Sequence, residues 1–532
     1  MRADPGPTRY DRTGRLRPRS ERWRIERLTR ANPLWGSNGI AFGPDGRLYV
    51  AQYVAGRISA VDIGSGDVEV VVDVDGPVQS PDDLAFGADG SMYITDLTPG
   101  RVWRRAPDGT ITLVAEDVLA PNGIACVGDR VFVNEMRPGG RVLEVTPGTG
   151  PVVLADGLAM GNAMQLGPDG CLYYPHMVTG EVHRVPLDGG APELVAEDVH
   201  APVAVRFDRG GVLTVLSRGE EGIVTRIDLF GSGDRTVVPG EVSGMDNAAF
   251  DTENRMFVSS FAAGGIAELA PDGRARTVVP SGLVGPFGVA VHRSGTVFTG
   301  DNHRLATVDD GEPVTRELLV HSHGVAADDG GRVHLTSQFG DVRSYDPDDR
   351  VLTTRARRLS RPTGVAARAD GSLVVAETGA GRVVAIAEDD TLTVLAEGLG
   401  APVDVAVDER DRCYVTDEQR GTVSLVGEDG TQVVAEGLDA PQGIAAVGEE
   451  LFVVETGRRR LLAVDPATGE RRVEAQDLAV GLPPGTARPQ PALSTCGLPG
   501  VPVPFAGVAA GPDGSLYVSA NGEGSVLHLR RG

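Results

Sequence analysis

Residues 38–53 read NGIAFGPDGRLYVAQY, and this stretch decides the fold. Two short apolar runs, 40–42 and 48–50, flank the segment Gly43-Pro44-Asp45-Gly46. That segment supplies the residue types that a tight turn between two strands needs. The stretch therefore predicts a β-hairpin that one polar residue, Asn38, opens.

The same phrase recurs along the whole chain. Its opening residues stand at positions 38, 82, 122, 162, 203, 246, 287, 323, 363, 403, 442 and 506. Their spacing is 36 to 44 residues, except for a last gap of 64. Two further apolar runs follow each hairpin, so one period holds four antiparallel strands, which is typical of a β-propeller blade. Twelve copies predict an all-β fold of two tandem six-bladed propellers.

The ends of the chain indicate how the rings close. The last copy lacks a fourth strand, and a lone candidate strand, 23–28, precedes the first hairpin. We expect each half to lend its leading strand to its own last blade, so that 23–28 pairs with 266–269 and no sheet edge stays open. The predicted domains are 23–272 and 273–532, after a disordered Arg- and Pro-rich tail, 1–22. One twelve-bladed ring, closed in the same way, is the alternative.

Composition excludes several kinds of partner. The chain of 532 residues has a formal net charge of −24, which disfavours nucleic acid and anionic membranes as partners. It contains no apolar stretch near 18 residues and, in residues 1–22, no apolar segment of a signal peptide. We expect a small-molecule substrate and no membrane or nucleic-acid partner.

Residue usage also limits the cofactors. The sequence has no lysine, which excludes pyridoxal phosphate, and no motif for a nicotinamide cofactor stands out. Four cysteines fall in separate blades without a CxxC pair, namely Cys126, Cys171, Cys413 and Cys496. They are predicted to be free thiols of a cytoplasmic protein.

The residues that open the blades differ between the halves. A propeller places them at the channel mouth, on the face to which the second strands return. In the first half they are Asn38, Asp82, Asn122, Asn162, Val203 and Asp246. Converging carboxylates and amides suit Ca²⁺ or Mg²⁺, so the five polar members are the predicted metal ligands. Asx-turns that start strands are the alternative, although the second half has no carboxylate at these positions.

Other side chains near this mouth complete a candidate active site. His176 is a candidate general base or acid, together with Asp82 and Asp246. Thioethers and aromatic rings around a polar centre suit a partly apolar ligand, and packing between loops is the alternative. The predicted substrate-binding residues are Tyr53, Glu135, Met136, Met160, His200, Met245 and Phe261. Most acidic residues that end second strands are interpreted as structural.

Two features of the second half remain open. His303, His321 and His323 could meet at its channel mouth, either as an exposed cluster or as a transition-metal site. A Pro-rich insertion, 482–504, separates the last two blades. It is interpreted either as a lid over the mouth of this half or as a linker.

The repeats resemble the superfamily that joins NHL repeats with the SMP-30/gluconolactonase family. In that family a Glu, two Asn and an Asp at blade openings hold a divalent cation, and Pro121-Asn122-Gly123 matches one Asn motif. Asp82-Asp83 resembles the Asn-Asp-Gly motif, whereas Asn38 and Val203 depart from the pattern. The resemblance implies a metal-dependent lactone or ester hydrolase.

Two other functions compete with hydrolysis. One is a lyase or cyclase that acts on a secondary metabolite, because strictosidine synthase-like enzymes and streptogramin B lyase share the architecture. The other is a non-catalytic binding or scaffold propeller.

Overall fold

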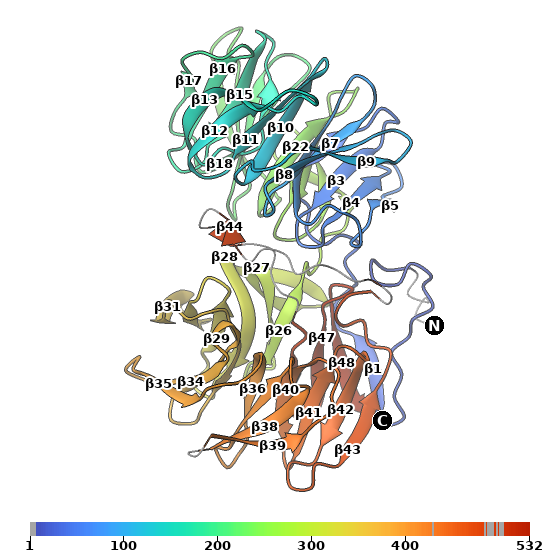
Figure 1. Ribbon diagram of the computed structural model, residues 1–532, viewed down its shortest axis with the longest axis vertical. Helices are drawn as coiled ribbons and strands as arrows, with labels where there is room; N and C mark the ends of the chain where they lie inside the picture. The colour runs from blue at the N-terminus through green and yellow to red at the C-terminus, as the bar shows by residue number, and fades with distance from the viewer. Residues whose placement is uncertain (1–6, 428–429, 484–485, 487–493, 496–497, 500–504) are drawn as a thin grey trace. The chain divides into compact units, whose positions relative to one another are not determined.

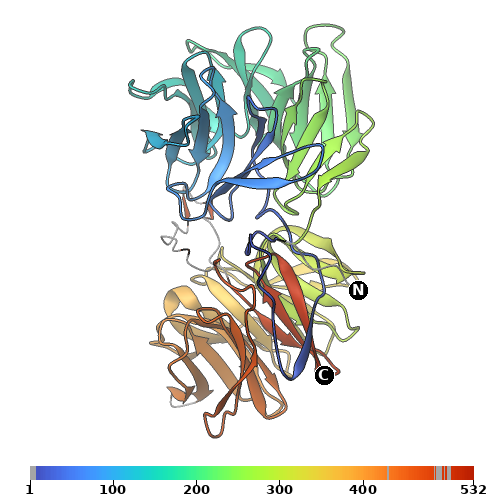
Figure 2. The ribbon, with the colours of Figure 1, turned by 90° about the vertical axis from the view of Figure 1, so that its right-hand side faces the viewer.

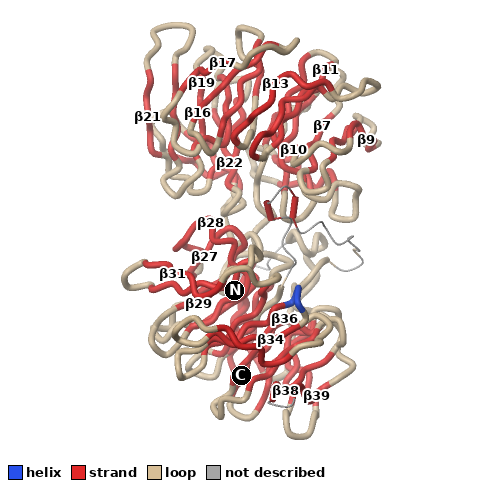
Figure 3. The backbone as a smooth tube through the Cα atoms, turned by 60° about the vertical axis from the view of Figure 1, so that its left-hand side comes forward, coloured by secondary structure: helices blue, strands red, loops and turns tan. Residues whose placement is uncertain are grey.

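The computed structural model describes residues 7–427, 430–483, 486, 494–495, 498–499 and 505–532. Within these ranges the regular secondary structure consists of strands and one 3-10 turn, η1 (Thr378–Ala380), which loops connect (Figure 3). No helix of the described residues is long and apolar enough to cross a membrane. The predicted all-β fold of four-stranded antiparallel blades is confirmed.

Two compact units divide the chain. The first, here called the first ring, is Pro33–Ser281 with Thr486–Val501, and most of the latter segment lies outside the described residues. The second, here called the second ring, combines Met1–Asn32, Gly282–Gly485 and Pro502–Gly532. Each ring is described below by itself, and its mouth is the end at which the first strands of its blades begin.

The first ring has six blades in chain order, several of which are labelled in Figure 1. Their strands are β2 (Ile40–Phe42), β3 (Leu48–Gln52), β4 (Arg57–Val61) and β5 (Val68–Val72); β6 (Pro81–Phe86), β7 (Met92–Asp96), β8 (Arg101–Arg105) and β9 (Ile111–Ala115); β10 (Pro121–Val127), β11 (Arg130–Glu135), β12 (Pro138–Glu144) and β13 (Val152–Ala159); β14 (Gln165–Leu166), β15 (Cys171–His176), β16 (Glu181–Pro186) and β17 (Glu193–Ala196); β18 (Pro202–Phe207), β19 (Leu213–Ser217), β20 (Ile223–Ile227) and β21 (Arg235–Pro239); β22 (Met245–Phe250), β23 (Met256–Ser260), β24 (Ile266–Leu269) and β25 (Ala275–Val279).

The second ring begins with a six-stranded sheet that holds two blades, because β27 and β28 each run through two strand positions. Its strands are β26 (Pro286–Val291), β27 (Val297–Asp309), β28 (Glu312–Ala327), β29 (Val333–Ser337), β30 (Val342–Asp346) and β31 (Val351–Ala356); β32 (Pro362–Ala367), β33 (Leu373–Glu377), β34 (Arg382–Ile386) and β35 (Leu392–Ala396); β36 (Pro402–Val407), β37 (Cys413–Asp417), β38 (Thr422–Gly427) and β39 (Gly430–Ala435); β40 (Pro441–Val447), β41 (Glu450–Glu455), β42 (Arg460–Val464) and β43 (Arg471–Ala475); β46 (Val508–Ala510), β47 (Leu516–Ala520), β48 (Ser525–Arg531) and β1 (Trp23–Arg27). A separate two-stranded ribbon contains β44 (Ser494–Thr495) and β45 (Leu498–Pro499).

Each ring closes on itself. In the first ring the backbone N–H of Ser37 donates to the carbonyl of Ser260 at 3.3 Å, and the Ser259 hydroxyl donates to the carbonyl of Asn38 at 2.6 Å. In the second ring the N–H of Gly507 donates to the carbonyl of Phe287 at 2.9 Å. A single ring of twelve blades is therefore wrong.

The predicted closing strand belongs to the other ring. β1 pairs with β48, from Trp23↔Arg531 to Arg27↔Leu527, and so completes the last blade of the second ring (Figure 2). The predicted pairing of 23–28 with 266–269 is wrong, because β25 follows β24 in sequence and pairs with it. The predicted boundary at 272 is corrected accordingly, since the first ring extends to Ser281.

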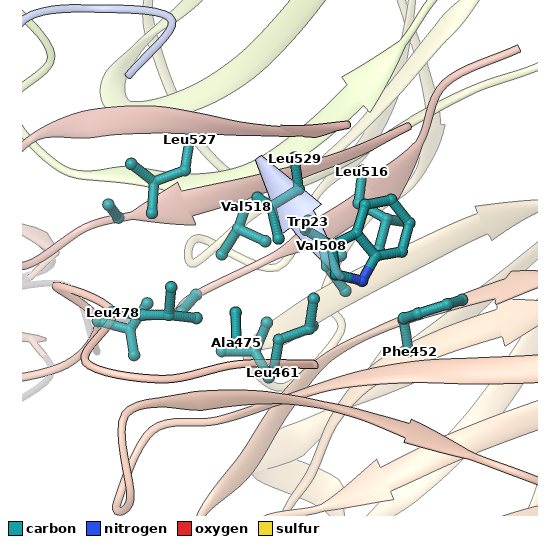
Figure 4. Close-up of a cluster of buried hydrophobic side chains, with 14 of the residues drawn as sticks. Trp23, Phe452, Leu461, Ala475, Leu478, Val508, Leu516, Val518, Leu527 and Leu529 are labelled. Carbon is teal, nitrogen blue, oxygen red and sulfur yellow. The ribbon is translucent and has the colours of Figure 1, made fainter. Parts of the chain in front are cut away.

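The closing strand is held by packing as well as by its ladder. Trp23 is buried beside Phe452, with ring centroids 6.0 Å apart in an edge-to-face arrangement (Figure 4). Leu461, Leu478 and Leu529 belong to the same apolar cluster. The Trp23 indole N–H also donates to Glu474 at 2.6 Å. Burial of this size is worth several kcal/mol, so β1 stabilises the second ring beyond its backbone hydrogen bonds.

The predicted disordered tail is wrong for residues 7–22. Arg9 is buried and its guanidinium donates to the carbonyls of Val284, Asn521 and Gly522. Tyr10 is buried as well and donates to the carbonyl of Val480 at 3.0 Å. The tail is ordered because its Arg satisfies backbone carbonyls of the second ring, a role that composition alone does not indicate.

Candidate functional site

A bulge aims the opening residues into the mouth of the first ring. The pairing of first and second strands shifts register between Pro81 and Leu84, and it shifts in the same way in β10 and β22. Residues 82–83, 122–123 and 246–247 are the ones left out of the ladder. A bulge of this kind redirects side chains, so the polar opening residue and its successor both leave the sheet.

Asp82 and Asp246 form the electrostatic centre of this mouth. Asp82 is 6% exposed, and burial followed by the charges of Asp246 and Asp83 raises its pKa well above the ordinary value. Burial also raises the pKa of Asp246 to about 7, against the opposing effect of Arg218. Neither carboxylate has a hydrogen-bond partner among the described residues. Two carboxyl groups that share one site without partners favour a bound cation or a shared proton.

Arg218 brings a guanidinium to the same place. It directly follows β19, and its charge acts on both Asp82 and Asp246. Its guanidinium carbon lies 4.8 Å from the centroid of the Phe261 ring, and its Nη1 lies 3.9 Å from the Met177 sulfur. Its Nε is buried without a partner among the described residues. The group is thus able to donate a hydrogen bond to a ligand in the mouth.

Two of the predicted asparagines face one thioether. The Asn122 and Asn162 side-chain amides point their Nδ2 atoms at the Met136 sulfur, at 3.2 and 3.7 Å. The Asn162 Oδ1 accepts the backbone N–H of Ala163, whereas the Asn122 Oδ1 is buried without a partner among the described residues. An unpaired buried oxygen has a free-energy cost that a cation or a donor would remove. Asn38 is also buried at the mouth.

The residues that directly follow the second strands form a rim. They include the predicted Tyr53, Met136 and Phe261, and the Tyr53 hydroxyl lies 3.3 Å from that of Thr98. The full set is Tyr53, Leu97, Met136, Met177, Arg218 and Phe261. Because five are apolar or aromatic and one is a cation, the rim suits a ligand with a carbon skeleton and an oxygen acceptor.

A second layer of polar groups lies directly below the mouth. The buried Arg206 donates to the carbonyls of Ala248 and Met164 and to the Asn247 Oδ1. The Asn247 Nδ2 in turn donates to Asp83 at 3.0 Å, and the Arg206 Nη2 lies 3.7 Å from the other Asp83 oxygen. This network fills the channel. It also positions the opening residues Asp82 and Asp246, because Asp83 directly follows Asp82 and Asn247 directly follows Asp246.

Sequence reasoning missed Arg218, Asp83, Arg206 and Asn247. Only Arg218 had a usable signal, because it occupies the same place after a second strand as Tyr53 and Met136. The other three come together across the ring, from β6, β18 and β22, and nothing in the repeat pattern indicates that contact.

Several predicted substrate-binding residues have other partners. Both oxygens of the fully buried Glu135 are used by Arg137, Arg141 and the backbone N–H of Leu119. Met245 is fully buried in the apolar core between the last two blades of the first ring, away from solvent. We therefore leave Glu135 and Met245 out of the site.

Met160 and His200 lie in loops between blades. Met160 is partly buried with a φ of 63°, and its carbonyl accepts the N–H of Met177 at 3.1 Å. His200 is exposed. Val203 opens its blade as a buried apolar residue. We therefore do not assign these three residues to the site of Asp82 and Asp246.

Acidic residues that end second strands have a recurring structural role. The Asp96 carboxylate accepts the N–H groups of Gln79 and Ser80, which belong to the loop before its own blade. Asp301, Glu377, Asp417 and Glu455 accept loop N–H groups in the same way. The structural interpretation of these carboxylates is confirmed.

His176 lies in a separate cluster on β15 and β16. Its ring stacks on that of His183 with centroids 4.1 Å apart, and its Nδ1 lies 3.6 Å from the Glu181 Oε2. Burial and the charge of His183 lower the pKa of His176 to about 4. Of the described residues, His176, Glu181 and His183 form the one group of three that could supply imidazole and carboxylate ligands to a metal. The contacts of the His176 ring are with Tyr174, His183 and Glu181, so we do not group it with Asp82 and Asp246.

The predicted histidine cluster of the second ring is divided. The rings of His303 and His321 lie 5.2 Å apart, whereas His323 packs on Phe287 and Phe505 at 4.8 and 5.7 Å. Cys126, Cys171 and Cys413 are free thiols, and Cys496 lies outside the described residues. Most of the insertion 482–504, and with it the predicted lid, lies outside the described residues too.

No family model matches the chain, and no curated protein matches it. Among solved structures, streptogramin B lyase is similar with 16% identity and a TM-score of 0.39, over 55% of this chain and 96% of its own. A gluconolactonase from Xanthomonas campestris has 18% identity and a TM-score of 0.37, over 45% and 87%.

A calcium-binding protein, regucalcin from Agrobacterium tumefaciens, has 20% identity and a TM-score of 0.37, over 46% of this chain and 86% of its own. The chain is a β-propeller protein, as its blades already establish.

Proposed function

We propose that the mouth of the first ring is the active site of a metal-dependent hydrolase that opens a lactone or cleaves an ester. One observation carries the proposal: Asp82 and Asp246 are carboxylates without a hydrogen-bond partner among the described residues, and Asn122, which opens the blade after that of Asp82, has an unpaired buried oxygen. Structural residues of this kind are normally paired, so an unpaired set at a channel mouth supports a bound ligand.

The donor set fits a hard divalent cation. Asp82, Asp246 and Asn122 would hold it through oxygen atoms, with Asn38 and Asn162 as further ligands on the same ring of residues. Burial and the negative charges of Asp246 and Asp83 raise the pKa of Asp82, and the positive charge of the ion would offset that repulsion between carboxylates. When bound, Ca²⁺ or Mg²⁺ supplies a Lewis acid for a carbonyl oxygen.

The protein groups have separate roles in this scheme. Asp246, whose carboxylate has no hydrogen-bond partner among the described residues, would take a proton from water and later return it to the leaving oxygen. Arg218 would donate a hydrogen bond to the oxygen on which negative charge develops. Met136, Met177 and Phe261 would contact the carbon skeleton of the substrate and exclude water.

The first test measures metal binding. We expect Ca²⁺ or Mg²⁺ to raise the melting temperature of the first ring in the wild type and not in the double variant Asp82→Ala/Asp246→Ala. Asp89→Ala is the matched control, because Asp89 is a carboxylate in an exposed pair with Arg104. Wild-type protein that neither contains nor responds to these ions would exclude this metal site.

His183→Ala separates the two candidate metal positions. If Zn²⁺ or Ni²⁺ binds and this variant alone abolishes the effect, the metal belongs to the cluster of His176, Glu181 and His183. That outcome would contradict our assignment to the mouth.

The second test measures the reaction. In a panel of lactones and esters in ¹⁸O-labelled water, hydrolysis places the label in the product acid, and Asp246→Asn should reduce kcat at least about 100-fold. A lyase is the second candidate, which the apolar rim favours. It would give products without the label.

Arg218→Leu is expected to lower kcat more than it raises KM, because charge on the oxygen grows in the transition state.

A further inference from the structure

The channel of the second ring contains a cavity of about 220 Å³. It follows the first strands of all six blades, β26, β28, β32, β36, β40 and β46. Asp404 is the one charged residue of its lining, and every other lining residue is Gly, Ala, Val, Ile or Phe. The cavity is roomy enough for about seven water molecules at roughly 30 Å³ each, or for a small organic molecule.

Asp404 has only backbone partners among the described residues. It is 7% exposed, and its two oxygens accept the N–H groups of Val405 at 2.9 Å and Ile444 at 3.0 Å. No arginine or histidine of the described residues pairs with it. Burial raises the pKa of Asp404 to about 8. Gly364 of the neighbouring blade leaves the room that this side chain occupies, because a Cβ there would clash with its oxygen.

The two ends of the cavity differ. At the mouth, Phe287, Val403 and Phe505 form a buried apolar cluster, and His323 packs on both phenylalanine rings. At the opposite end the lining residues are partly exposed, and they are Val291, Ala327, Ala367, Val407, Ala446 and Ala510. A ligand would therefore enter from the end that carries the hairpin turns and meet Asp404 at the closed end.

The first ring shows what the framework places beside such a carboxylate. Asp83 and Asp404 occupy equivalent positions in their blades. Each lies two residues after a proline that pairs with the end of the second strand. Three blades further round the ring, the guanidinium of Arg206 reaches Asp83. Three blades round from Asp404, the position that corresponds to Arg206 holds Ala290, which lines the cavity.

We propose that the channel of the second ring binds a small organic cation, a primary amine or guanidine with a short alkyl chain, whose cationic head pairs with Asp404. In the first ring Arg206 supplies the cation that faces Asp83, and in the second ring a free ligand would take the corresponding place beside Asp404. The rest of the ligand lies along the backbone of the first strands, because side chains such as Val325, Val365 and Val405 pack into the apolar clusters between blades. From Asp404 to Val407 the strand advances about 10 Å, which is the length available to the ligand. This site is independent of the function proposed for the first ring.

Calorimetric titration of the full-length protein at pH 8.5 tests the proposal, with hexylamine and butylguanidine as probes and 1-hexanol as the neutral control. We expect both cations to bind at least about 10-fold more tightly than hexanol, because the neutral alcohol has no charge to pair with Asp404. Asp404→Asn should remove this difference.

Equal affinity for hexanol and hexylamine would overturn the proposal, and so would undiminished cation binding by a folded Asp404→Asn variant. If neither cation binds the wild type, the channel contains solvent alone and the proposal is wrong.

Discussion

At the scale of single residues, the ion pair below the first mouth combines stability and positioning. Replacing Arg206 by Met leaves the buried carboxylate of Asp83 without its cation, and an unpaired buried charge is costly. We expect Arg206→Met to lower the unfolding free energy of the first ring by about 3–5 kcal/mol. Calorimetry that resolves the transitions of the two units measures it.

The companion variant removes both charges. Arg206→Met/Asp83→Asn should recover a large part of the loss, because the remaining amide is neutral and still accepts the N–H of Leu84. Arg104→Met is the control. Its partner Asp89 is half exposed, so a change below about 1 kcal/mol is expected. Equal losses at Arg104 and Arg206 would contradict the importance of burial.

The opening residues of the candidate site could be predicted from the sequence, whereas the groups that act on them could not. Asp82 and Asp246 stand at a fixed place in each repeat, and that place defines the mouth. Arg206 stands at a position where the other blades have ordinary strand residues, and its partner Asp83 lies 123 residues away. A repeat pattern reports what copies share, so a contact made by one copy alone escapes it.

At the scale of elements, the closing strand is the part of the fold with the largest effect on the second ring. We expect Trp23→Ala to destabilise that ring by about 3–5 kcal/mol, because the substitution opens a cavity beside Phe452 and removes the indole donor of Glu474, which among the described residues keeps only Arg472. The transition of the first ring should not move. Arg24→Ala is the matched control on the same strand, because the Arg24 side chain is 73% exposed. In this variant the melting transitions of both rings should stay in place.

The number and type of the blades were predictable, and the pairing of the closing strand was not. Twelve hairpin phrases specify twelve blades, because turn residues and alternating apolar runs are local signals. Partner choice for β1 is not local: any blade that lacks a fourth strand could accept it. The packing of Trp23 in the cluster with Leu461 and Leu529 is specific to the last blade, and such complementarity between distant residues has no sequence signature.

At the scale of the whole molecule, the two units differ in how the chain builds them. Residues 33–281 form the first ring from blades that are each continuous in sequence, apart from the segment Thr486–Val501. The second ring needs a strand from the opposite end of the chain. We expect residues 33–281 to fold when expressed alone and residues 282–532 to aggregate, because β48 then presents an unpaired edge.

A circular permutant tests this division of the chain. The N–H of Gly532 donates to the carbonyl of Arg22 at 3.0 Å, so the end of β48 and the start of β1 are adjacent. A protein that joins 282–532 through a short turn to residues 20–32 would form β48 and β1 as a hairpin and close the ring in sequence order. We expect this permutant to be monomeric and to melt cooperatively, and the same permutant with Trp23→Ala to melt at a lower temperature. If 282–532 is equally stable without residues 20–32, β1 does not close the second ring.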